Sequence, residues 1–465
     1  TVGPEQEYFL VDKKYYDKRK DLIYTGRTLF GAKPPKGQEL EDHYFGVIKP
    51  RVKAFMKDLN EELWKLGIYA KTEHNEVAPA QHELAPIFTT TNIAADHNQL
   101  TMEIMKKVAL RHDLVCLLHE KPFAGVNGSG KHNNWSLSTN KGENLLKPGK
   151  SPYENAQFLL FLCSVIKAVD EYQDLLRTSV ASAGNDHRLG ANEAPPAIVS
   201  MFLGDELEGI LEAIEKDEPY TGIEAKQLQT GVHVLPDLAM DTTDRNRTSP
   251  FAFTGNKFEF RMLGSAISIS CPNIMLNTIA AEELRQFADE LEGTADLEGD
   301  VRKIVRRVMQ QHKRIIFNGD GYSEIWQREA ERRGLPNYPS TPDALPRFTD
   351  PEVVSMCERY GIFSRQELKA RQDIYLEQYV KTVRTEANLA LRMARTQIYP
   401  AVSRYQRELA DSSGKARELG INPELSVLKE TASGLVALDK AIRALEKLRD
   451  AAPKRSVLDE ARYCQ

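Results

Sequence analysis

The chain has 465 residues, of which 41% are hydrophobic and 28% are charged, and its formal net charge at pH 7 is -5. This length accommodates two or three domains, or one large catalytic domain with an appendage, and the composition is typical of a soluble globular protein. The small net charge gives no electrostatic reason to expect a nucleic acid or an acidic membrane as partner, and no stretch approaches the roughly 18 apolar residues of a membrane helix. The five cysteines include no CxxC pair, which indicates reduced thiols and a cytoplasmic location.

Short strands and longer helices alternate along the first two thirds of the chain. The apolar spacing predicts strands at 5–11, 68–73, 82–89 and within 121–138. It predicts helices over 45–66, 96–120, 151–179 and 267–292, with loops and short strands over 180–262. Residues 12–45 are polar, aromatic and rich in glycine and proline, which suits a long loop or a ligand-facing excursion. The pattern favours an α+β fold over a regular βαβ repeat.

The last third of the chain has a different composition. Residues 318–352 are rich in Gly, Pro, Asn and Asp and are the best linker candidate. A capping-box pattern at 364–367 predicts a long helix with a kink at Pro400. A second helix, with a leucine-rich stripe, starts near Pro423 and would form an antiparallel hairpin with the first. We interpret the hairpin as an interaction or oligomerisation element rather than a catalytic one.

Four dispersed segments each carry a charged or metal-ligating residue in largely apolar surroundings: three carry carboxylates, and two carry histidines. They are GPEQEYFLVD at 3–12, HNEVAPAQHEL at 74–84, NGSGKHNNWSLS at 127–138 and NKFEFR at 256–261. A solvated surface explains one acidic pair easily, but it explains four such segments poorly. Their residue types suit a two-metal site for phosphoryl transfer.

Two pairs of glutamates stand out within these segments. Glu5 and Glu7 would project from the same face of a strand, where two buried carboxylates repel each other unless a cation neutralises them. A solvent-facing strand edge is the alternative for this pair. Glu76 and Glu83 flank a turn, and two histidines lie beside them. Mg²⁺ and Mn²⁺ prefer oxygen ligands, and Mn²⁺ also tolerates imidazole.

The glycine-rich stretch 125–131 has the GxxxxGK spacing of a phosphate-binding P-loop. His132 follows it, however, where a P-loop has a serine or threonine that binds Mg²⁺. The next residues, NNWSLS, are typical of a strand and not of the helix that would receive the phosphates. We therefore reject the P-loop and expect a turn that brings the backbone close to a ligand, with His132 as a metal ligand.

Arginines accompany the glutamates. Arg188 precedes Glu193, and Arg247 lies in the stretch DRNRTSP. Arg261 follows Glu259 by two residues, which puts both side chains on one strand face. Guanidinium groups suit carboxylate and phosphate oxygens. For any one arginine a surface salt bridge is the simpler interpretation, but their clustering with glutamates favours a site.

The ordered segments GPEQE, EVAPAQHE, NGSGKHNNWS, EAPP and EFR, within residues 3–261, together resemble the glutamine synthetase family. The NGSGKHNNWSLS form, FNGDGYS at 317–323 and the helical C-terminal extension resemble its type III branch. The resemblance implies a guanido-kinase-like catalytic fold, a curved antiparallel sheet with helices, over 1–350, and a helical extension over 351–465. The family also has an N-terminal β-grasp domain without a counterpart here, so we expect a segment upstream of residue 1.

The resemblance also assigns roles to matching positions. It implies one metal held by Glu7, Glu76 and Glu83, and another held by Glu5, His132 and Glu259. It places glutamate against Asn127, Gly128, Arg188 and His74, and ATP against Asn134, Ser136 and Lys257. It gives catalytic roles to Glu193, Arg247 and Arg261. Glu193 matches a flap glutamate that closes the site, and the two arginines would stabilise the transferring phosphoryl group.

The implied activity is ATP-dependent ligation of ammonia to glutamate through a γ-glutamyl phosphate, with two or more Mg²⁺ or Mn²⁺ ions. The implied partners are glutamate, ammonium, ATP and other copies of the chain, in a dodecamer of two hexameric rings. Two alternatives stay open: a γ-glutamyl ligase for a bulkier amine, and a non-catalytic paralogue used in nitrogen sensing. Ala252 stands where the family has a further arginine, and Lys257 is the candidate to replace it.

Overall fold

The computed structural model describes residues 1–220, 227–228, 238–239, 247–453 and 455–465. The chain divides into two compact units, and each is described by itself. The first unit contains Thr1–Tyr16 and Lys33–Gln372, and the second contains Asp17–Ala32 and Asp373–Gln465. The functional boundary at residue 350 stays a prediction. Within the described residues, every helix is too short or too polar to cross a membrane.

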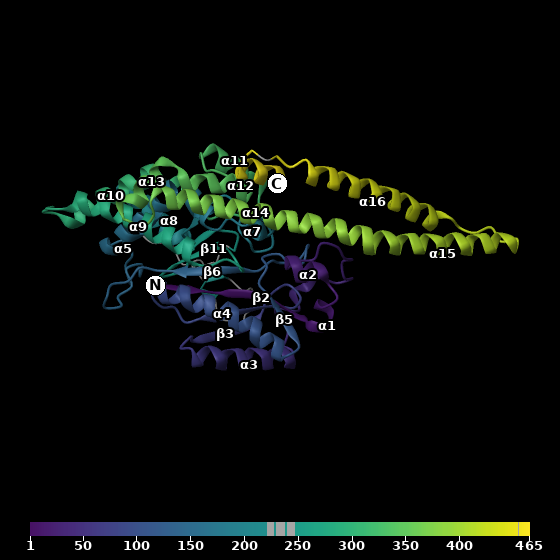
Figure 1. Cartoon of the computed structure of the whole chain (residues 1–465). Coiled ribbons are helices and arrows are strands. Elements are labelled where there is room, and N and C mark those ends of the chain that lie inside the picture. Colours follow the sequence, from purple (N-terminus) through teal and green to yellow (C-terminus); the bar gives the residue numbers. More distant parts are fainter. Residues whose placement is uncertain (221–226, 229–237, 240–246, 454) are drawn as a thin grey trace. The chain divides into compact units, whose positions relative to one another are not determined.

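The first unit is built around two sheets (Figure 1). The larger sheet has the order β1-β6-β11-β10-β7, and its neighbours are antiparallel except for the parallel pair β10 and β7. Its strands are β1 (Val2–Pro4), β6 (Gly130–Trp135), β7 (Met201–Phe202), β10 (Phe251–Phe253) and β11 (Phe258–Gly264). Fully buried phenylalanines join β10 to β11, with the rings of Phe251 and Phe258 stacked at 4.9 Å.

The smaller sheet has the order β3-β4-β2-β5 and is antiparallel throughout. Its strands are β2 (Gln6–Asp12), β3 (Ala70–Asn75), β4 (Gln81–Pro86) and β5 (Leu114–Leu117). Helices α3 (Pro50–Lys65) and α4 (Thr91–Arg111) bury their apolar faces against it, through residues such as Phe55, Leu59 and Met105. The chain passes from the larger sheet to the smaller one at Glu5, between β1 and β2.

The remaining elements of the first unit are mostly helices. They are α1 (Lys13–Tyr16), α5 (Ala156–Glu171), α6 (Gln173–Ser179), α7 (Ala183–Arg188), α8 (Asp205–Lys216), α9 (Ser270–Leu291), α10 (Leu297–His312), α11 (Glu324–Arg332), α12 (Thr341–Ala344) and α13 (Pro351–Arg359). The 3-10 turns are Glu39–Glu41, Lys313–Ile315 and Leu345–Thr349, and the short strands β8 (Gln227–Leu228) and β9 (Leu238–Ala239) pair with each other.

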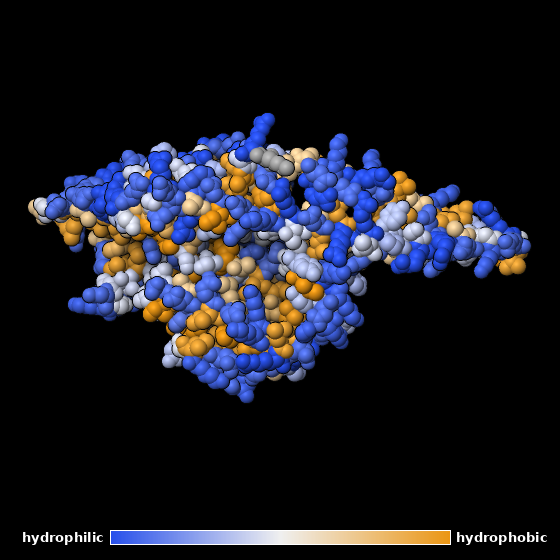
Figure 2. Space-filling view, viewed as in Figure 1, coloured by the Kyte–Doolittle hydropathy of each residue, from blue (hydrophilic) through white to orange (hydrophobic). Residues whose placement is uncertain are grey.

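The second unit is helical. Its helices are α2 (Lys20–Thr25), most of α14 (Arg365–Met393), α15 (Tyr399–Glu418), α16 (Ser426–Asp450) and α17 (Val457–Cys464). Pro400 has no N–H for the preceding turn, and the backbone widens there into a π-helical segment, Ala394–Ile398. Helices α15 and α16 lie side by side (Figure 1), and hydrophilic residues cover most of their visible surface (Figure 2).

The α+β class and the helical hairpin are confirmed, whereas the kink expected at Pro400 stays a prediction, because the structure has a π-helical segment there. The helix expected over 96–120 is wrong at its end, because α4 stops at Arg111 and β5 follows. The loops and strands expected over 180–262 also include the helices α7 and α8. The linker expected over 318–352 is wrong, since that stretch carries α11 and α12. Its Trp326 stacks on Phe317 with ring centroids 3.7 Å apart, which packs the segment into the first unit. The strands expected to form one curved antiparallel sheet are divided between two sheets.

Candidate active site

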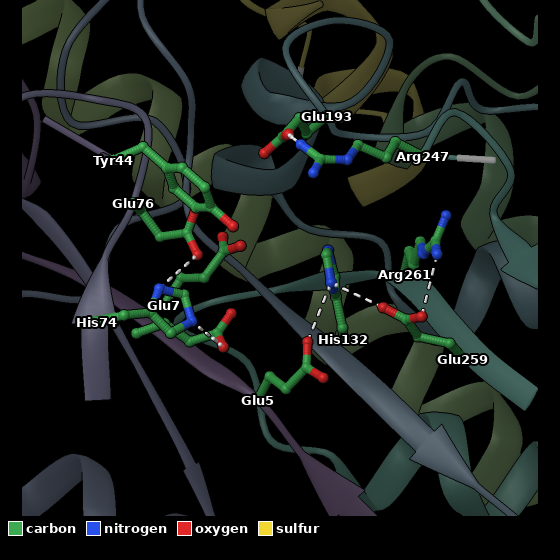
Figure 3. Close-up of a pocket in the computed structure, with 11 residues that line it drawn as sticks. Glu5, Glu7, Tyr44, His74, Glu76, His132, Glu193, Arg247, Glu259 and Arg261 are labelled. Atoms are coloured by element: carbon green, nitrogen blue, oxygen red, sulfur yellow. Dashed lines mark hydrogen bonds and ion pairs between the residues drawn. The ribbon is translucent and has the colours of Figure 1, made fainter. Parts of the chain in front are cut away.

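A polar cavity in the first unit is lined by strands of both sheets and by loop residues (Figure 3). Its lining residues are Glu5, Glu7, Tyr44, His74, Glu76, Glu83, His132, Glu193, Arg247, Glu259 and Arg261. Every residue that the sequence predicts as a metal ligand is among them. The predicted catalytic residues are there as well. The structure therefore brings together side chains that are separated by more than 250 residues in the chain.

One group of ligand atoms lies on the β3–β4 hairpin. The antiparallel register puts His74 directly opposite Glu83, and His74 Nε2 lies 3.1 Å from Glu83 Oε1. His74 Nδ1 lies 3.5 Å from Glu76 Oε1. One ligand atom from each of these three residues falls within 4.8 Å of the others, a spacing that suits one metal ion. The resemblance gave His74 to the substrate, whereas the geometry groups it with two predicted metal ligands.

A second group joins the two sheets. His132 Nδ1, on β6, lies 3.0 Å from Glu259 Oε1 on the adjacent strand β11 and 3.2 Å from Glu5 Oε2. The backbone N–H of Glu5 donates to His132 O at 3.0 Å, which fixes this residue between the sheets. Asn134 Nδ2 donates to Glu5 Oε1 at 2.9 Å. These three ligand residues also present atoms within 4.8 Å of one another.

Glu7 connects the strand β2 to the glycine-rich turn. It stands opposite Glu83 in the β2–β4 register, and its Oε2 accepts a hydrogen bond from Gly130 N at 2.6 Å. Burial raises the pKa of Glu7 to about 7 even though His132 and Arg188 act to lower it. The carboxylate is thus held among charged groups, with a backbone donor on one oxygen.

The electrostatics of the cavity favour a bound cation. Burial, together with repulsion from Glu7 and Glu83, raises the pKa of Glu76 to about 9. The hydrogen bond to Glu83 is the main cause that raises the pKa of His74 to about 9. Crowded, buried carboxylates with one imidazole in each group form a hard, oxygen-rich donor set. The residues present therefore fit Mg²⁺ or Mn²⁺.

Glu259 is in a different electrostatic state. Burial acts to raise its pKa, but hydrogen bonds with His132 and Arg261 outweigh burial and hold that pKa well below its usual range. Arg261 Nη2 donates to Glu259 Oε2 at 3.0 Å, as the two-residue spacing predicts for one strand face. Each carboxylate oxygen of Glu259 thus already contacts a cationic side chain, His132 or Arg261.

A second cavity adjoins the first, because Glu5 lines both. Asn134, Ser136 and Lys257, the predicted ATP contacts, all line this second cavity. Ser136 Oγ donates to Asn256 O at 3.0 Å and ties β6 to the β10–β11 turn that carries Lys257. Ala252 is fully buried on β10. Lys257 lines the second cavity and is not among the residues that line the first, so its role as a replacement for the missing arginine stays a prediction.

Arg188 lies beside the glycine-rich turn. Its side chain is buried, and its guanidinium lies so close to Gly130 that a Cβ there would fall 2.5 Å from Cζ. Nη2 donates to Arg261 O at 3.1 Å, while Nε has no hydrogen-bond partner. Among the described residues, no carboxylate forms an ion pair with Arg188. A Cβ added to Gly128 would lie 3.2 Å from Arg188 Cγ, so these two predicted substrate contacts are close neighbours.

Glu193 and Arg247 face each other on the side of the cavity that lies opposite the predicted metal ligands (Figure 3). Arg247 Nη1 donates to Glu193 Oε1 at 2.6 Å, and Asn127 Nδ2 donates to Glu193 Oε2 at 3.3 Å. Glu193 has φ +67°, a left-handed conformation that is uncommon for a glutamate. The expected flap residue is therefore held in a strained backbone by two side chains.

Three residues near the cavity have no signal in their local sequence. Tyr44 lines the cavity, with its ring 6.2 Å from that of His74 in an edge arrangement. Gln38 pairs with Asn127 through two hydrogen bonds of 2.8 Å. Both come from the segment 12–45, where the long loop expected from the sequence is wrong, because the stretch carries α1 and α2 and residues 17–32 belong to the second unit. The ligand-facing role of the rest stays a prediction. Glu120, fully buried against Gly264, is the third.

Comparisons with known proteins bear on the whole chain. Residues 1–200 match the family described as "Glutamine synthetase, catalytic domain", and residues 300–417 match "Glutamine synthetase C-terminal domain". The chain is 49% identical to "Glutamine synthetase" of Butyrivibrio fibrisolvens, over 100% of this chain and 67% of that protein. It is 51% identical to "Type-3 glutamine synthetase" of Dictyostelium discoideum, over 89% of this chain and 56% of that protein.

Among solved structures, "Apo GmaS without ligand" is similar with a TM-score of 0.49 and 16% identity, over 82% of this chain and 68% of that one. The chain spans 67% and 56% of the lengths of the two curated relatives. The predicted resemblance is confirmed at the level of the family, and a type 3 member is among the relatives. By these matches, the chain belongs to the glutamine synthetase family.

Proposed function

We propose that this chain forms the catalytic part of a cytoplasmic ligase that joins ammonia to the γ-carboxylate of L-glutamate with consumption of ATP. The observation that carries the proposal is the pair of carboxylate and histidine groups in one cavity, which adjoins a second cavity lined by Asn134, Ser136 and Lys257. A carboxylate is a poor acyl donor, so phosphorylation by ATP would first convert it to a γ-glutamyl phosphate. Ammonia would then displace phosphate to give glutamine.

The residues suited to hold Mg²⁺ or Mn²⁺ are the two predicted sets: Glu7, Glu76 and Glu83, and Glu5, His132 and Glu259. Bound ions would supply positive charge that offsets the repulsion between the phosphoryl group and the substrate carboxylate. Arg247 and Arg261 add fixed positive charge at the same cavity. Arg261 is buried, so little solvent screens it.

Glutamate would bind with its α-carboxylate at Arg188, beside Asn127 and Gly128. A buried guanidinium without an ion-pair partner among the described residues is costly, and a substrate carboxylate would compensate it. Glu193 would cover the cavity and exclude water, because water would hydrolyse the acyl phosphate before ammonia attacks it. Its carboxylate oxygens also provide an acceptor for a proton from the ammonium adduct.

The test is to measure phosphate and glutamine together, with ATP, glutamate and Mg²⁺ or Mn²⁺, in the presence and absence of ammonium. We expect ammonium-dependent glutamine matched by an equal amount of phosphate. Glu193→Gln should lower the glutamine formed per phosphate, because the neutral amide cannot accept the proton. ATP binding without ammonium-dependent glutamine would contradict the proposal.

The same assay separates the alternatives. The bulky ring of Tyr44 lines the cavity 6.2 Å from the ring of His74, which supports ammonia over a bulkier amine. Methylamine in place of ammonium should therefore give a much lower rate, and a higher rate would support the bulkier-amine ligase. A nitrogen-sensing paralogue would bind ligands without turnover. We also propose a homo-oligomer of two hexameric rings. Size-exclusion chromatography with multi-angle light scattering would test it by measuring the molar mass of the assembly.

A further inference from the structure

The turn of sequence FNGDGYS, residues 317–323, has no part in the proposed chemistry. It lies in the first unit, immediately before helix α11, and does not line the cavity. Its polar groups nevertheless reach both chain segments that carry the Glu193–Arg247 ion pair.

One end of the turn contacts the Glu193 segment. Tyr322 Oη donates to Ala194 O at 2.9 Å, one residue beyond Glu193. This segment is strained, since Asn192 and Glu193 both have positive φ, at +55° and +67°. A hydrogen bond from a half-buried tyrosine to the next carbonyl favours that strained conformation over a relaxed one.

The other end contacts the Arg247 segment. Gly321 N donates to Thr248 Oγ1 at 2.8 Å, one residue beyond Arg247. Gly321 approaches the backbone so closely that an added Cβ would lie 3.0 Å from Thr248 O. A larger residue at position 321 would therefore push the two segments apart.

The turn itself is anchored to the fold. Phe317 N donates to Met201 O at 2.8 Å, as part of an isolated bridge beside the strand β7, and Asn318 Oδ1 accepts from Leu203 N at 3.1 Å. Ser323 Oγ caps helix α11 by accepting from Trp326 N at 3.1 Å. The anchored turn thus makes two hydrogen bonds, one to the residue after Glu193 and one to the residue after Arg247.

We propose that residues 317–323 brace the site, with Tyr322 and Gly321 as positioning residues that set Glu193 against Arg247. The brace explains how a glutamate keeps a left-handed backbone and an exposed arginine keeps one orientation, because each is fixed through its neighbour. The catalytic consequence rests on the proposed function, but the geometric claim does not.

The geometric claim is tested by hydrogen–deuterium exchange on the full chain, with peptides covering 190–196 and 247–249. Tyr322→Phe removes one hydroxyl and keeps the ring. The loss of one such hydrogen bond should speed exchange in 190–196 by about 2- to 12-fold. Tyr360→Phe is the matched control, because its hydroxyl donates to Glu282 at 2.7 Å, away from the cavity lining. Unchanged exchange in Tyr322→Phe, or equal acceleration in 190–196 by the control, would overturn the brace.

A second variant tests the other end. Thr248→Val removes the acceptor of Gly321 N, so exchange should rise in 247–249 and at Gly321 itself, with a smaller change in 190–196. Rapid exchange confined to 190–196 in this variant would contradict a brace with two independent ends.

The catalytic consequence is measured as glutamine formed per phosphate released. A loosened Glu193 admits water, so Tyr322→Phe should lower this ratio while the KM for ATP stays at the parent value. An unchanged ratio alongside faster exchange would overturn the catalytic part of the proposal. If the parent chain makes no glutamine, the proposed function has failed, and the exchange experiment still decides whether the brace exists.

Discussion

Replacing Gly130 by alanine tests the placement of Arg188 without altering a polar atom. An alanine Cβ would lie 2.5 Å from Arg188 Cζ and 2.9 Å from Nε, well inside van der Waals contact. The backbone N–H that donates to Glu7 would remain. Because the guanidinium is the mobile end of a long side chain, we expect it to shift while strand β6 stays in place.

The shift of the guanidinium should weaken glutamate binding by an amount that can be calculated. A displaced guanidinium loses alignment with the Arg261 carbonyl, now 3.1 Å away, and with the substrate carboxylate. One charge-assisted hydrogen bond is worth about 1.5 to 3 kcal/mol, which corresponds to about a 10- to 150-fold increase in the KM for glutamate. The KM for ATP should not change, since the second cavity, which we propose for ATP, is lined by other residues.

The assay is initial-rate glutamine synthesis with glutamate varied at saturating ATP, and then the reverse. Calorimetric titration with glutamate gives the same comparison without turnover. Gly434→Ala is the control, because Gly434 lies in α16 and an added Cβ meets nothing within 4 Å. An unchanged KM for glutamate would refute the assignment of Arg188. A parallel rise in the KM for ATP would instead indicate distortion of β6.

Three further predictions concern charged groups. Lys131→Met should cost about 3 kcal/mol in urea unfolding, since Lys131 Nζ donates to the Ser265 and Ile267 carbonyls and interacts with Glu120, even though burial lowers the pKa of Lys131 to about 7. Adding Glu120→Gln should recover part of the loss. Burial acts to raise the pKa of Glu282, but hydrogen bonds, led by that from Tyr360, outweigh burial and lower the pKa to about 2. The stabilisation that Glu282 gives to the folded chain is therefore complete above its ordinary pKa of 4.5 and is lost as the pH falls toward 2. Glu282→Gln should therefore lower the midpoint of urea unfolding at pH 7 and leave it unchanged near pH 2. Glu259→Gln should reduce tightly bound Mn²⁺ in electron paramagnetic resonance from about two ions per chain to about one; an unchanged count would contradict two separate groups.

The parts of the site that could be predicted are those governed by strand geometry and local spacing. Residues 74–83 form a strand–turn–strand unit, so His74 and Glu83 meet across it. Glu259 and Arg261 share a face for the same reason. The pairing of these strands with β6 joins residues far apart in the chain, and no local pattern encodes it. The family resemblance, which reflects the whole ordered set of segments, supplied that information.

The parts that could not be predicted depend on long loops and on packing. Gln38 and Tyr44 approach the site because their loop folds back over it, with His43 Nδ1 hydrogen-bonded to Glu76 O at 2.7 Å. Such a contact leaves no periodic trace in the sequence. Residues 318–352 were expected to be a linker because of their glycines and prolines. Packing of Trp326 on Phe317 fixes that stretch instead, so turn-forming residues there mark a tight brace rather than a flexible joint.

The clearest failure of a local rule concerns Glu5 and Glu7, and it explains how the site is divided. The alternation rule places both on one strand, but β1 ends at Pro4 and β2 begins at Gln6, so Glu5 belongs to neither. Glu5 turns toward His132 of the larger sheet, while Glu7 stays opposite Glu83 in the smaller sheet. A two-residue step from Glu5 to Glu7 thus links the two ligand groups. Any change that alters the angle between the sheets at this step must also change the separation of the groups and, under the proposed function, their fit to a phosphoryl group held between two cations.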